Sequence, residues 1–348
     1  MRVLVTGAGG LIGSEAVRYF LKKYLVWGID NDMRSTFFGK SGSVRHIIDS
    51  LSSLEGYTHF NSDITSQEQM ETIFKNVKPD VIIHCAAQPS HDKAADIPIL
   101  DFNVNAFGTL NLLECTRKYC NSDATFIHMS TNKVYGDGPN SIELIESDMR
   151  YDFKSTVFYQ GIDEYFSIDN CLHSLFGASK LSADITAQEY GRYFGMNVGI
   201  FRGGCLTGPQ HSGVELHGFL SYIVKCAVLN KQYTVFGYKG KQVRDQIHSS
   251  DVIKAFDKFI ENPKKGEVYN MGGGKENSAS VLEVIQLLKD DHDLSLDYDI
   301  SDNNRVGDHI CYYTNLFKFK RHFPEWDITK NLNEIIDEIV YSVRSVDR

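Results

Sequence analysis

Short apolar segments and amphipathic helical segments alternate along the first two hundred residues of the chain. Apolar runs bounded by polar residues predict buried strands, at residues 3–5, 26–29, 58–60, 80–84, 124–129 and 197–201. Apolar residues spaced three and four apart predict helices, at residues 14–22, 67–76, 105–119 and 175–194. This alternation is typical of an α/β fold with a doubly wound parallel sheet.

The alternation is interrupted after residue 202. Glycine and proline occur repeatedly over residues 203–213, and one further strand–helix unit follows later in the chain. The pattern predicts helices at 216–229, 251–260, 280–289 and 332–343, and strands at 233–236 and 267–271. We therefore predict a sheet domain formed by residues 1–202 with 247–271, and a small C-terminal lobe formed by residues 203–246 with 272–348.

A glycine-rich turn joins the first predicted strand to the first predicted helix, and residues 7–13 read Gly-Ala-Gly-Gly-Leu-Ile-Gly. In such a unit the glycines permit a tight turn and a close approach of the backbone to a pyrophosphate. The helix N-terminus adds free N–H groups and the positive end of a dipole. The turn predicts a Rossmann dinucleotide site, with contacts from Gly7, Gly10, Leu11, Ile12 and Gly13.

An acidic residue ends the second predicted strand. Asp30 lies about 20 residues beyond the glycines, where a carboxylate hydrogen-bonds the ribose 2′-hydroxyl of a dinucleotide. A carboxylate there repels a 2′-phosphate, so we predict NAD rather than NADP, with Asp30 and Asn31 as contacts. Arg34 is near enough in sequence to soften this preference, and Asp32 opposes Arg34.

The composition and charge of the chain limit which kinds of partner and cellular compartment are expected. The chain has 348 residues, of which 42% are hydrophobic and 23% charged, with a net charge of −9. We expect no nucleic-acid partner because there is no long basic run, and no membrane segment because no apolar stretch is long enough. We expect no signal peptide because Met1-Arg2 leads directly into a predicted strand. The seven cysteines are dispersed, which favours the reducing cytoplasm and no metal site.

Four further motifs indicate a family. They are Asn-Val-Asn-Ala-Phe-Gly-Thr-Leu-Asn-Leu-Leu at 103–113, Ser-Thr-Asn-Lys-Val-Tyr-Gly at 130–136, Phe-Gly-Ala-Ser-Lys at 176–180 and Gln-Val-Arg-Asp at 242–245. With the glycine turn, the chain resembles the extended short-chain dehydrogenase/reductase superfamily, the group of nucleotide-sugar epimerases and 4,6-dehydratases. Within it, residues 130–137 and 240–245 are most similar to the CDP-paratose 2-epimerase (CDP-tyvelose epimerase) group.

The resemblance implies an NAD-dependent epimerase that oxidises a ring hydroxyl of a nucleotide sugar transiently to a ketone. A nucleotide-sugar 4,6-dehydratase or reductase of the same superfamily is the alternative enzyme. A protein that binds NAD and a sugar nucleotide without catalysis is the alternative of another class. The resemblance also implies a homodimer, because the helices at 105–119 and 175–194 match the pair that forms a four-helix interface in this superfamily.

The resemblance also assigns catalytic positions. Thr131 is in the place of the hydroxyl that bonds the reacting sugar oxygen, and Lys180 is in the place of the lysine that binds the nicotinamide ribose. The family's catalytic tyrosine is expected four residues before the lysine, on the same helix face, where this chain has Phe176. Phenylalanine cannot move a proton, and a positioned acid/base is worth about 10²–10⁴ in rate.

Three accounts of Phe176 remain open: another side chain has taken over, the reaction needs no such base, or the protein binds without efficient redox chemistry. The favoured substitute is His91, because histidine as a residue type suits proton transfer near neutral pH and His91 follows the strand tip at residue 84 in a predicted loop. Other candidates are Asp92, Tyr159, Tyr165 and Cys205.

The resemblance implies further cofactor contacts from Asp63 and Ile64 at the adenine, Ala86, Ala87 and Gln88 along the ribose and pyrophosphate, and Asn105 at the start of the following helix. Arginine matches phosphate groups bidentately. The substrate residues that we expect are Thr131, Asn132, Arg202, Glu215, Arg244 and Arg305.

Overall fold

The computed structural model describes residues 1–211, 218–303 and 307–346, and the chain forms two compact units. Unit 1 consists of Met1–Val134, Leu175–Arg202 and Val252–Tyr269. Unit 2 consists of Tyr135–Ser174, Gly203–Asp251 and Asn270–Arg348. The sequence-based division differs over residues 135–174, which it assigns to the sheet domain. Long-range contacts within unit 2 hold this segment, including the bridge between Ile162 and Thr314.

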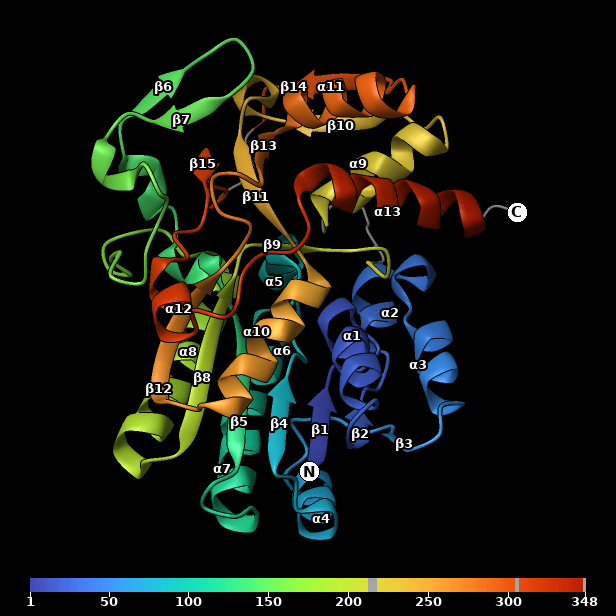
Figure 1. Ribbon diagram of the computed structural model, residues 1–348, viewed down its shortest axis with the longest axis vertical. Coiled ribbons are helices and arrows are strands. Elements are labelled where there is room, and N and C mark those ends of the chain that lie inside the picture. The colour runs from blue at the N-terminus through green and yellow to red at the C-terminus, as the bar shows by residue number, and fades with distance from the viewer. Residues whose placement is uncertain (212–217, 304–306, 347–348) are drawn as a thin grey trace. The chain divides into compact units, whose positions relative to one another are not determined.

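Unit 1 contains a seven-stranded sheet in the order β12-β8-β5-β4-β1-β2-β3 (Figure 1). Its strands are β1 (Arg2–Thr6), β2 (Leu25–Ile29), β3 (Tyr57–Phe60), β4 (Val81–His84), β5 (Thr125–Thr131), β8 (Asn197–Gly203) and β12 (Lys265–Met271). β1 pairs in parallel with both β2 and β4. The strand order reverses between β1 and β4, and in open α/β sheets ligands bind at such a switch point, beyond the carboxyl ends of the strands.

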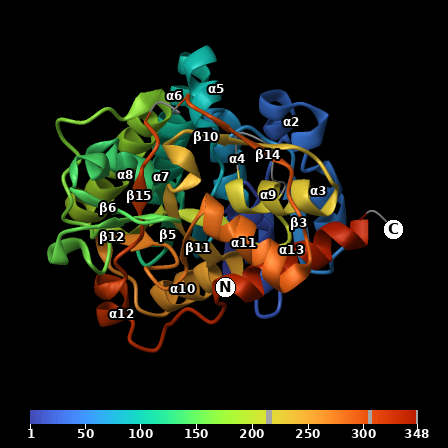
Figure 2. The same cartoon turned by 90° about the horizontal axis from the view of Figure 1, so that it is seen from above.

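Helices cover both faces of this sheet, with α7 and α8 on one face and α10 on the other (Figures 1 and 2). The helices of unit 1 are α1 (Leu11–Phe20), α2 (Met33–Phe38), α3 (Arg45–Ser52), α4 (Gln67–Val77), α5 (His91–Asp96), α6 (Pro98–Phe102), the π-helical turn η2 (Asn103–Phe107), α7 (Gly108–Tyr119), α8 (Ser174–Phe194) and α10 (Ser249–Glu261), with a 3-10 turn η1 (Lys40–Gly42) after α2.

Burial on both faces explains why the central strands lack polar–apolar alternation. Val3, Leu4 and Val5 of β1 are fully buried, as are Ile82 and Ile83 of β4. A parallel strand that helices cover on both sides is apolar at nearly every position, and the sequences of β1 and β4 have this continuous apolar pattern. The doubly wound α/β fold is therefore confirmed.

Unit 2 is built from small sheets and three longer helices. Its strands are β6 (Leu144–Glu146), β7 (Tyr151–Phe153), β9 (Cys205–Thr207), β10 (Tyr233–Phe236), β11 (Val243–His248), β13 (Ser278–Ser280), β14 (Tyr298–Ser301) and β15 (Cys311–Tyr312). Its helices are α9 (Phe219–Val228), α11 (Val281–His292), α12 (Phe317–His322) and α13 (Leu332–Val346), with 3-10 turns at Gly138–Ser141, Thr156–Phe158 and Tyr238–Gly240; a further turn, η3 (Asn132–Tyr135), crosses from unit 1. Apolar side chains of α9, α11 and α13 form its core.

The predicted helices at 280–289 and 332–343 correspond to α11 and α13, and Ser280 forms a capping box with Glu283 at the start of α11. The helix predicted at 216–229 corresponds to α9 from Phe219 onward. The prediction misses the short helices α2, α3, α5 and α6, which are too brief to give a clear periodic signal. It also places His91 in a loop, whereas His91 is the first residue of α5.

Candidate NAD and sugar site

The glycine turn has the geometry that close backbone packing requires. Gly7 has a φ of +69°, and a Cβ atom on it would lie 2.7 Å from the backbone nitrogen of Ala86. A Cβ atom on Gly13 would lie 2.0 Å from the carbonyl oxygen of Gly7. Neither position can hold a side chain without displacing backbone. Among the described residues no side chain caps the start of α1 at Gly10, so an anion can take the place of a cap.

Asp30 meets the glycine turn directly. The Gly9 N–H donates to Asp30 Oδ2 at 2.9 Å, and the Asp32 N–H donates to Asp30 Oδ1 at 2.8 Å. Burial raises the pKa of Asp30, and these two backbone bonds oppose the rise. The structure thus brings the predicted ribose-binding carboxylate to the turn predicted to bind pyrophosphate. The neighbouring Asp32 is used internally, since it accepts the Val44 N–H at 2.8 Å.

Arg34 is turned toward protein groups. Its Nε donates to the Gly42 carbonyl at 3.2 Å, and its guanidinium lies 4.8 Å from the centroid of the Phe38 ring. In this conformation the cation that could favour a 2′-phosphate is engaged by α2 and the turn after it.

The tip of β4 leads into a buried polar network. The Gln88 N–H donates to Asn105 Oδ1 at 2.9 Å, and Gln88 Nε2 donates to Asp101 Oδ1 at 2.8 Å. Asp101 also accepts a 2.5 Å hydrogen bond from the Ser179 hydroxyl of α8. The side chains of Gln88 and Asn105 therefore connect α8 to the β4 tip, and Ala86 and Ala87, which precede Gln88, are half-buried.

Two residues predicted at the adenine follow β3. Ile64 is buried, and its carbonyl oxygen accepts a hydrogen bond from Asn111 Nδ2 of α7 at 2.8 Å. Asp63 is half-buried and accepts from the Thr65 N–H at 2.9 Å. Sequence reasoning missed Asn111, although it lies in the motif at 103–113.

Lys180 is buried in α8 at 4% exposure, and its Nζ donates to the Met129 carbonyl of β5 at 2.8 Å. Burial lowers the pKa of Lys180 to about 8, although the charges of Asp184 and Asp101 oppose this. Thr131 ends the same strand, and its hydroxyl oxygen accepts the Lys133 N–H at 3.2 Å. Asn132, also predicted in the substrate site, is buried next to it.

Phe176 is 8% exposed and lies one helical turn before Lys180. Its ring contacts the imidazole of His91, with the ring centroids 6.4 Å apart and the ring planes inclined by 60°. Two residues far apart in sequence are thus brought together. Of the other candidate bases, Asp92 follows His91 in α5, with its Oδ1 4.0 Å from His91 Nδ1. Tyr159 and Tyr165 belong to unit 2 and are 57% and 85% exposed.

Arg202 forms an internal ion pair. Its Nη2 lies 2.9 Å from Asp184 Oδ1, and its Nε donates to Asp184 Oδ2 at 3.0 Å. The Ser130 hydroxyl donates to the same carboxylate at 2.5 Å. With 4% exposure, Arg202 links β8 to α8, the helix that carries Lys180. The sequence signal for Asp184 is its position one turn after Lys180.

Of the remaining predicted substrate residues, the structure describes Arg244, which lies in unit 2. Arg244 of β11 pairs with Asp308, with Nη2 2.7 Å from Oδ1, and it also donates to the His309 carbonyl. Its side chain is 12% exposed. Glu215 and Arg305 lie outside the described residues. Cys205 begins β9 and is half-buried.

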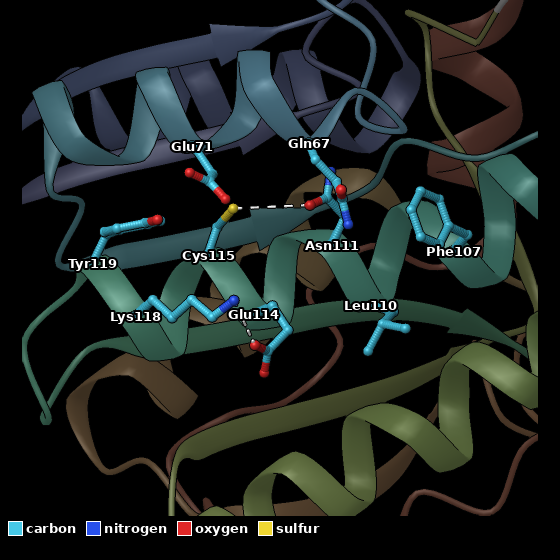
Figure 3. Close-up of a pocket in the computed structure, with 9 residues that line it drawn as sticks. All are labelled: Gln67, Glu71, Phe107, Leu110, Asn111, Glu114, Cys115, Lys118 and Tyr119. Carbon is cyan, nitrogen blue, oxygen red and sulfur yellow. Dashed lines mark hydrogen bonds and ion pairs between the residues drawn. The ribbon is translucent and has the colours of Figure 1, made fainter.

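A pocket between α4 and α7 lies among residues that the sequence did not single out for binding (Figure 3). Glu114 is paired with Lys118 at 3.1 Å and accepts from the Tyr190 hydroxyl at 2.6 Å. The lining residues are Gln67, Glu71, Phe107, Leu110, Asn111, Glu114, Cys115, Lys118 and Tyr119. Its charged side chains are paired within the protein, Glu71 with Lys75 and Glu114 with Lys118.

Among the described residues, no three His, Cys, Asp or Glu side chains are grouped so as to hold a metal ion. No helix within 1–211, 218–303 and 307–346 is long and apolar enough to span a membrane.

The arrangement in unit 1 defines a Rossmann protein whose residues fit an adenine dinucleotide: a turn closed to side chains, an uncapped helix start and a half-buried carboxylate at the turn. Residues 3–272 match the model of the NAD dependent epimerase/dehydratase family, and the chain belongs to this family.

Curated relatives include CDP-paratose 2-epimerase of Salmonella typhi, which is 34% identical over 83% of this chain and 84% of the relative. The dTDP-glucose 4,6-dehydratase of Salmonella typhimurium is 29% identical over 83% of this chain and 77% of the relative. Both the epimerase and the dehydratase branches of the resemblance are thus represented.

Solved structures share the fold. UDP-glucuronic acid 4-epimerase from Bacillus cereus, in complex with UDP-glucuronic acid and NAD, superposes with a TM-score of 0.80 at 24% identity and covers 99% of this chain and 100% of its own. The Thermus thermophilus UDP-glucose 4-epimerase complex with NAD gives a TM-score of 0.78 at 24% identity, covering 99% of each chain.

Proposed function

We propose that this protein is an NAD-dependent epimerase of a nucleotide-linked hexose, with CDP-hexoses the first class to test. The observation that carries the proposal is the 34% identity to a CDP-paratose 2-epimerase over 83% of the chain. The placement of Thr131 at the end of β5, the strand that the buried Lys180 contacts, supports it. The C2 position of the sugar is proposed from that relative's name.

Different residues of unit 1 would bind the cofactor and the reacting part of the sugar. The main-chain N–H groups at residues 11–13 would hold the pyrophosphate, because the Gly10 N–H already donates to the Gly7 carbonyl at 3.0 Å. Asp30 would accept a hydrogen bond from the adenosine ribose. When bound, NAD⁺ supplies a hydride acceptor that later returns the hydride. The Thr131 hydroxyl would hold the reacting sugar oxygen, and Lys180 would hold the nicotinamide ribose. Phe176 would only pack.

The nucleotide end of the substrate would be held by cationic and polar groups. Arg244 is the described cation proposed for the diphosphate, because a guanidinium can share its donors between Asp308 and a phosphate oxygen. Asn132, Glu215 and Arg305 stay predictions of substrate contact. Arg202 stays a prediction as well, but its ion pair with Asp184 favours an indirect role in supporting Thr131 and Lys180.

The test is incubation of the purified protein with NAD and a panel of CDP-, UDP-, dTDP- and GDP-hexoses. Proton NMR would report an epimer, and absorbance would report transient NADH. The Thr131→Val variant is the matched control, since it removes only the hydroxyl from a side chain of similar shape. An epimer formed by the wild type and lost in the variant supports the proposal. No epimer and no NADH from any sugar contradicts it, and NAD binding alone would then indicate a non-catalytic binding protein.

A nucleotide-sugar 4,6-dehydratase or reductase is the second candidate function. It is favoured by the dTDP-glucose 4,6-dehydratase relatives at 29% and 30% identity. The same NMR spectra distinguish the two, because a dehydratase loses water and gives a 4-keto-6-deoxy sugar in place of an epimer.

We further propose a homodimer formed through α7 and α8. The support is a set of exposed apolar side chains on these helices: Leu110, Leu175, Ile185, Tyr193 and Phe194. Sedimentation at micromolar concentration is expected to give a dimer, and Ile185→Asp to weaken it; a wild-type monomer would contradict this. The seven free cysteines support a reducing compartment, which we propose to be the cytoplasm.

A further inference from the structure

We infer that His91 performs the proton transfer for which Phe176 has no oxygen. This inference rests on the proposed function and names the residue that completes it. The first observation is the direct contact of the two rings, at 6.4 Å between centroids. Phe176 lies one turn before Lys180, so the imidazole is adjacent to the position from which a phenol would act.

The second observation is the framework that holds His91 there. Ser90 caps α5, whose first residue is His91, by accepting the Lys93 N–H at 3.1 Å. The Ser90 N–H donates to Gln88 Oε1, and Gln88 Nε2 returns a 2.8 Å bond to the Ser90 carbonyl. Gln88 is bound in turn to Asp101, and Asp101 to Ser179.

Ser179 lies between Phe176 and Lys180 on α8. An unbroken chain of buried hydrogen bonds therefore runs from the residue before His91 to the helix that carries both family positions. Asp101, Gln88 and Ser179 are each 1% exposed or less. A buried network whose polar groups are all hydrogen-bonded fixes the positions of the segments that it joins. The network therefore holds the start of α5, and with it His91, next to Phe176 of α8.

The third observation excludes the other imidazoles near Lys180. Both nitrogens of His84 are bonded, at 2.7 Å to the Thr6 hydroxyl and at 2.9 Å to that of Thr109. Burial, with a smaller contribution from the charge of Lys180, lowers the pKa of His84 to about 3 and that of His128 well below its usual range. A base needs both access and affinity for a proton. The His91 side chain is 16% exposed, and its Nδ1 lies 4.0 Å from Asp92 Oδ1, whereas its Nε2 is buried.

The step balances as a simple exchange. Bound NAD⁺ would supply the acceptor for the hydride that the ring carbon loses, while a nitrogen of the His91 imidazole would take the hydroxyl proton as the C–O bond becomes C=O. When the hydride returns to the opposite face of the ketone, the imidazolium gives its proton back to the oxygen. His91 thus ends the cycle neutral, and no further oxidant or reductant is consumed.

The experiment compares His91→Ala and His91→Gln with His46→Gln, a matched control in which an exposed histidine of α3 is replaced. The His91 variants are expected to lose about 10²–10⁴ in turnover, while the NAD dissociation constant and the melting temperature stay at wild-type values. Free imidazole is expected to restore part of the turnover of His91→Ala. If His91 had only a structural role, free imidazole would not restore the turnover of His91→Ala.

The second arm adds Phe176→Tyr to His91→Gln, which is expected to regain turnover by returning a phenol to the family position. A readout independent of turnover is the nitrogen NMR signal of His91, expected to move when a nucleotide sugar joins the NAD complex. Wild-type turnover in His91→Gln, or no signal change, would overturn the inference while leaving the proposed function intact. Turnover by Phe176→Tyr with none by the wild type would also overturn it. No turnover by either protein would instead contradict the proposed function.

Discussion

Replacement of Lys180 by methionine is expected to alter how the stability of the protein depends on pH. Lys180 is buried, and burial lowers the pKa of its ammonium group from 10.5 to about 8. In the unfolded chain the hydrated side chain recovers its ordinary pKa. Between these two values the unfolded state therefore holds a proton that the folded state has released, and the free energy of unfolding rises with pH.

The magnitude follows from the size of the shift. Each unit of pKa difference corresponds to about 1.4 kcal/mol, so Lys180 contributes stability that is fully present above pH 10.5 and is lost, by about 3 kcal/mol, as the pH falls through 8. Methionine does not titrate. The stability of Lys180→Met relative to wild type should therefore drop by about 2–3 kcal/mol between about pH 7 and about pH 10. The loss of the bond to Met129 is the same at both pH values and cancels.

Urea unfolding of both proteins at several pH values in this interval measures the effect, with Lys22→Met as a control for the loss of an exposed lysine just after α1. Because both proteins share all other ionisable groups, only their difference in unfolding free energy is compared. A difference that stays constant with pH would refute the reasoning, since it would mean that Lys180 keeps its ordinary proton affinity when folded.

Three other substitutions test the site. Gly13→Ala places a Cβ 2.0 Å from the Gly7 carbonyl, so NAD affinity measured by calorimetry should fall at least tenfold, and unchanged affinity would argue against the turn as the pyrophosphate site. Asp30→Ala should weaken NAD binding and reduce discrimination against NADP in the same assay, and an unaltered NAD-to-NADP ratio would contradict the ribose assignment. Arg202→Met leaves Asp184 buried without its cation, which should cost about 3–5 kcal/mol in denaturant unfolding; a loss below about 1 kcal/mol would show that the pair is not a structural anchor.

Sequence alone is sufficient for the sheet of unit 1 and its glycine turn. The apolar runs of β1 and β4 are continuous because both faces of these strands are covered, and the spacing from Gly7 to Asp30 fits one strand–helix–strand unit. A tight turn requires glycine and a buried strand requires apolar residues, so both features can be recognised directly in the sequence. The resemblance of residues 176–180 to the family motif is the basis for the prediction that Phe176 stands in place of the family's tyrosine.

Sequence is less informative where elements are short or stabilised from a distance. Helices such as α5 and α6 have six and five residues, too few for a periodic pattern, and depend on packing for their formation. The segment from Tyr135 to Ser174 follows β5 in sequence but is held by residues far later in the chain, including the bond from Tyr135 to Asn270. No local pattern encodes such partners.

The order of residues thus determined the fold class and the glycine turn after the first strand, because each depends on neighbours close in the chain. Tertiary structure alone decided that His91 meets Phe176, that Arg202 is held by Asp184 and that Lys180 is buried deeply enough to have a lowered pKa. The physical reason is that distances and desolvation arise only when segments far apart in sequence pack together.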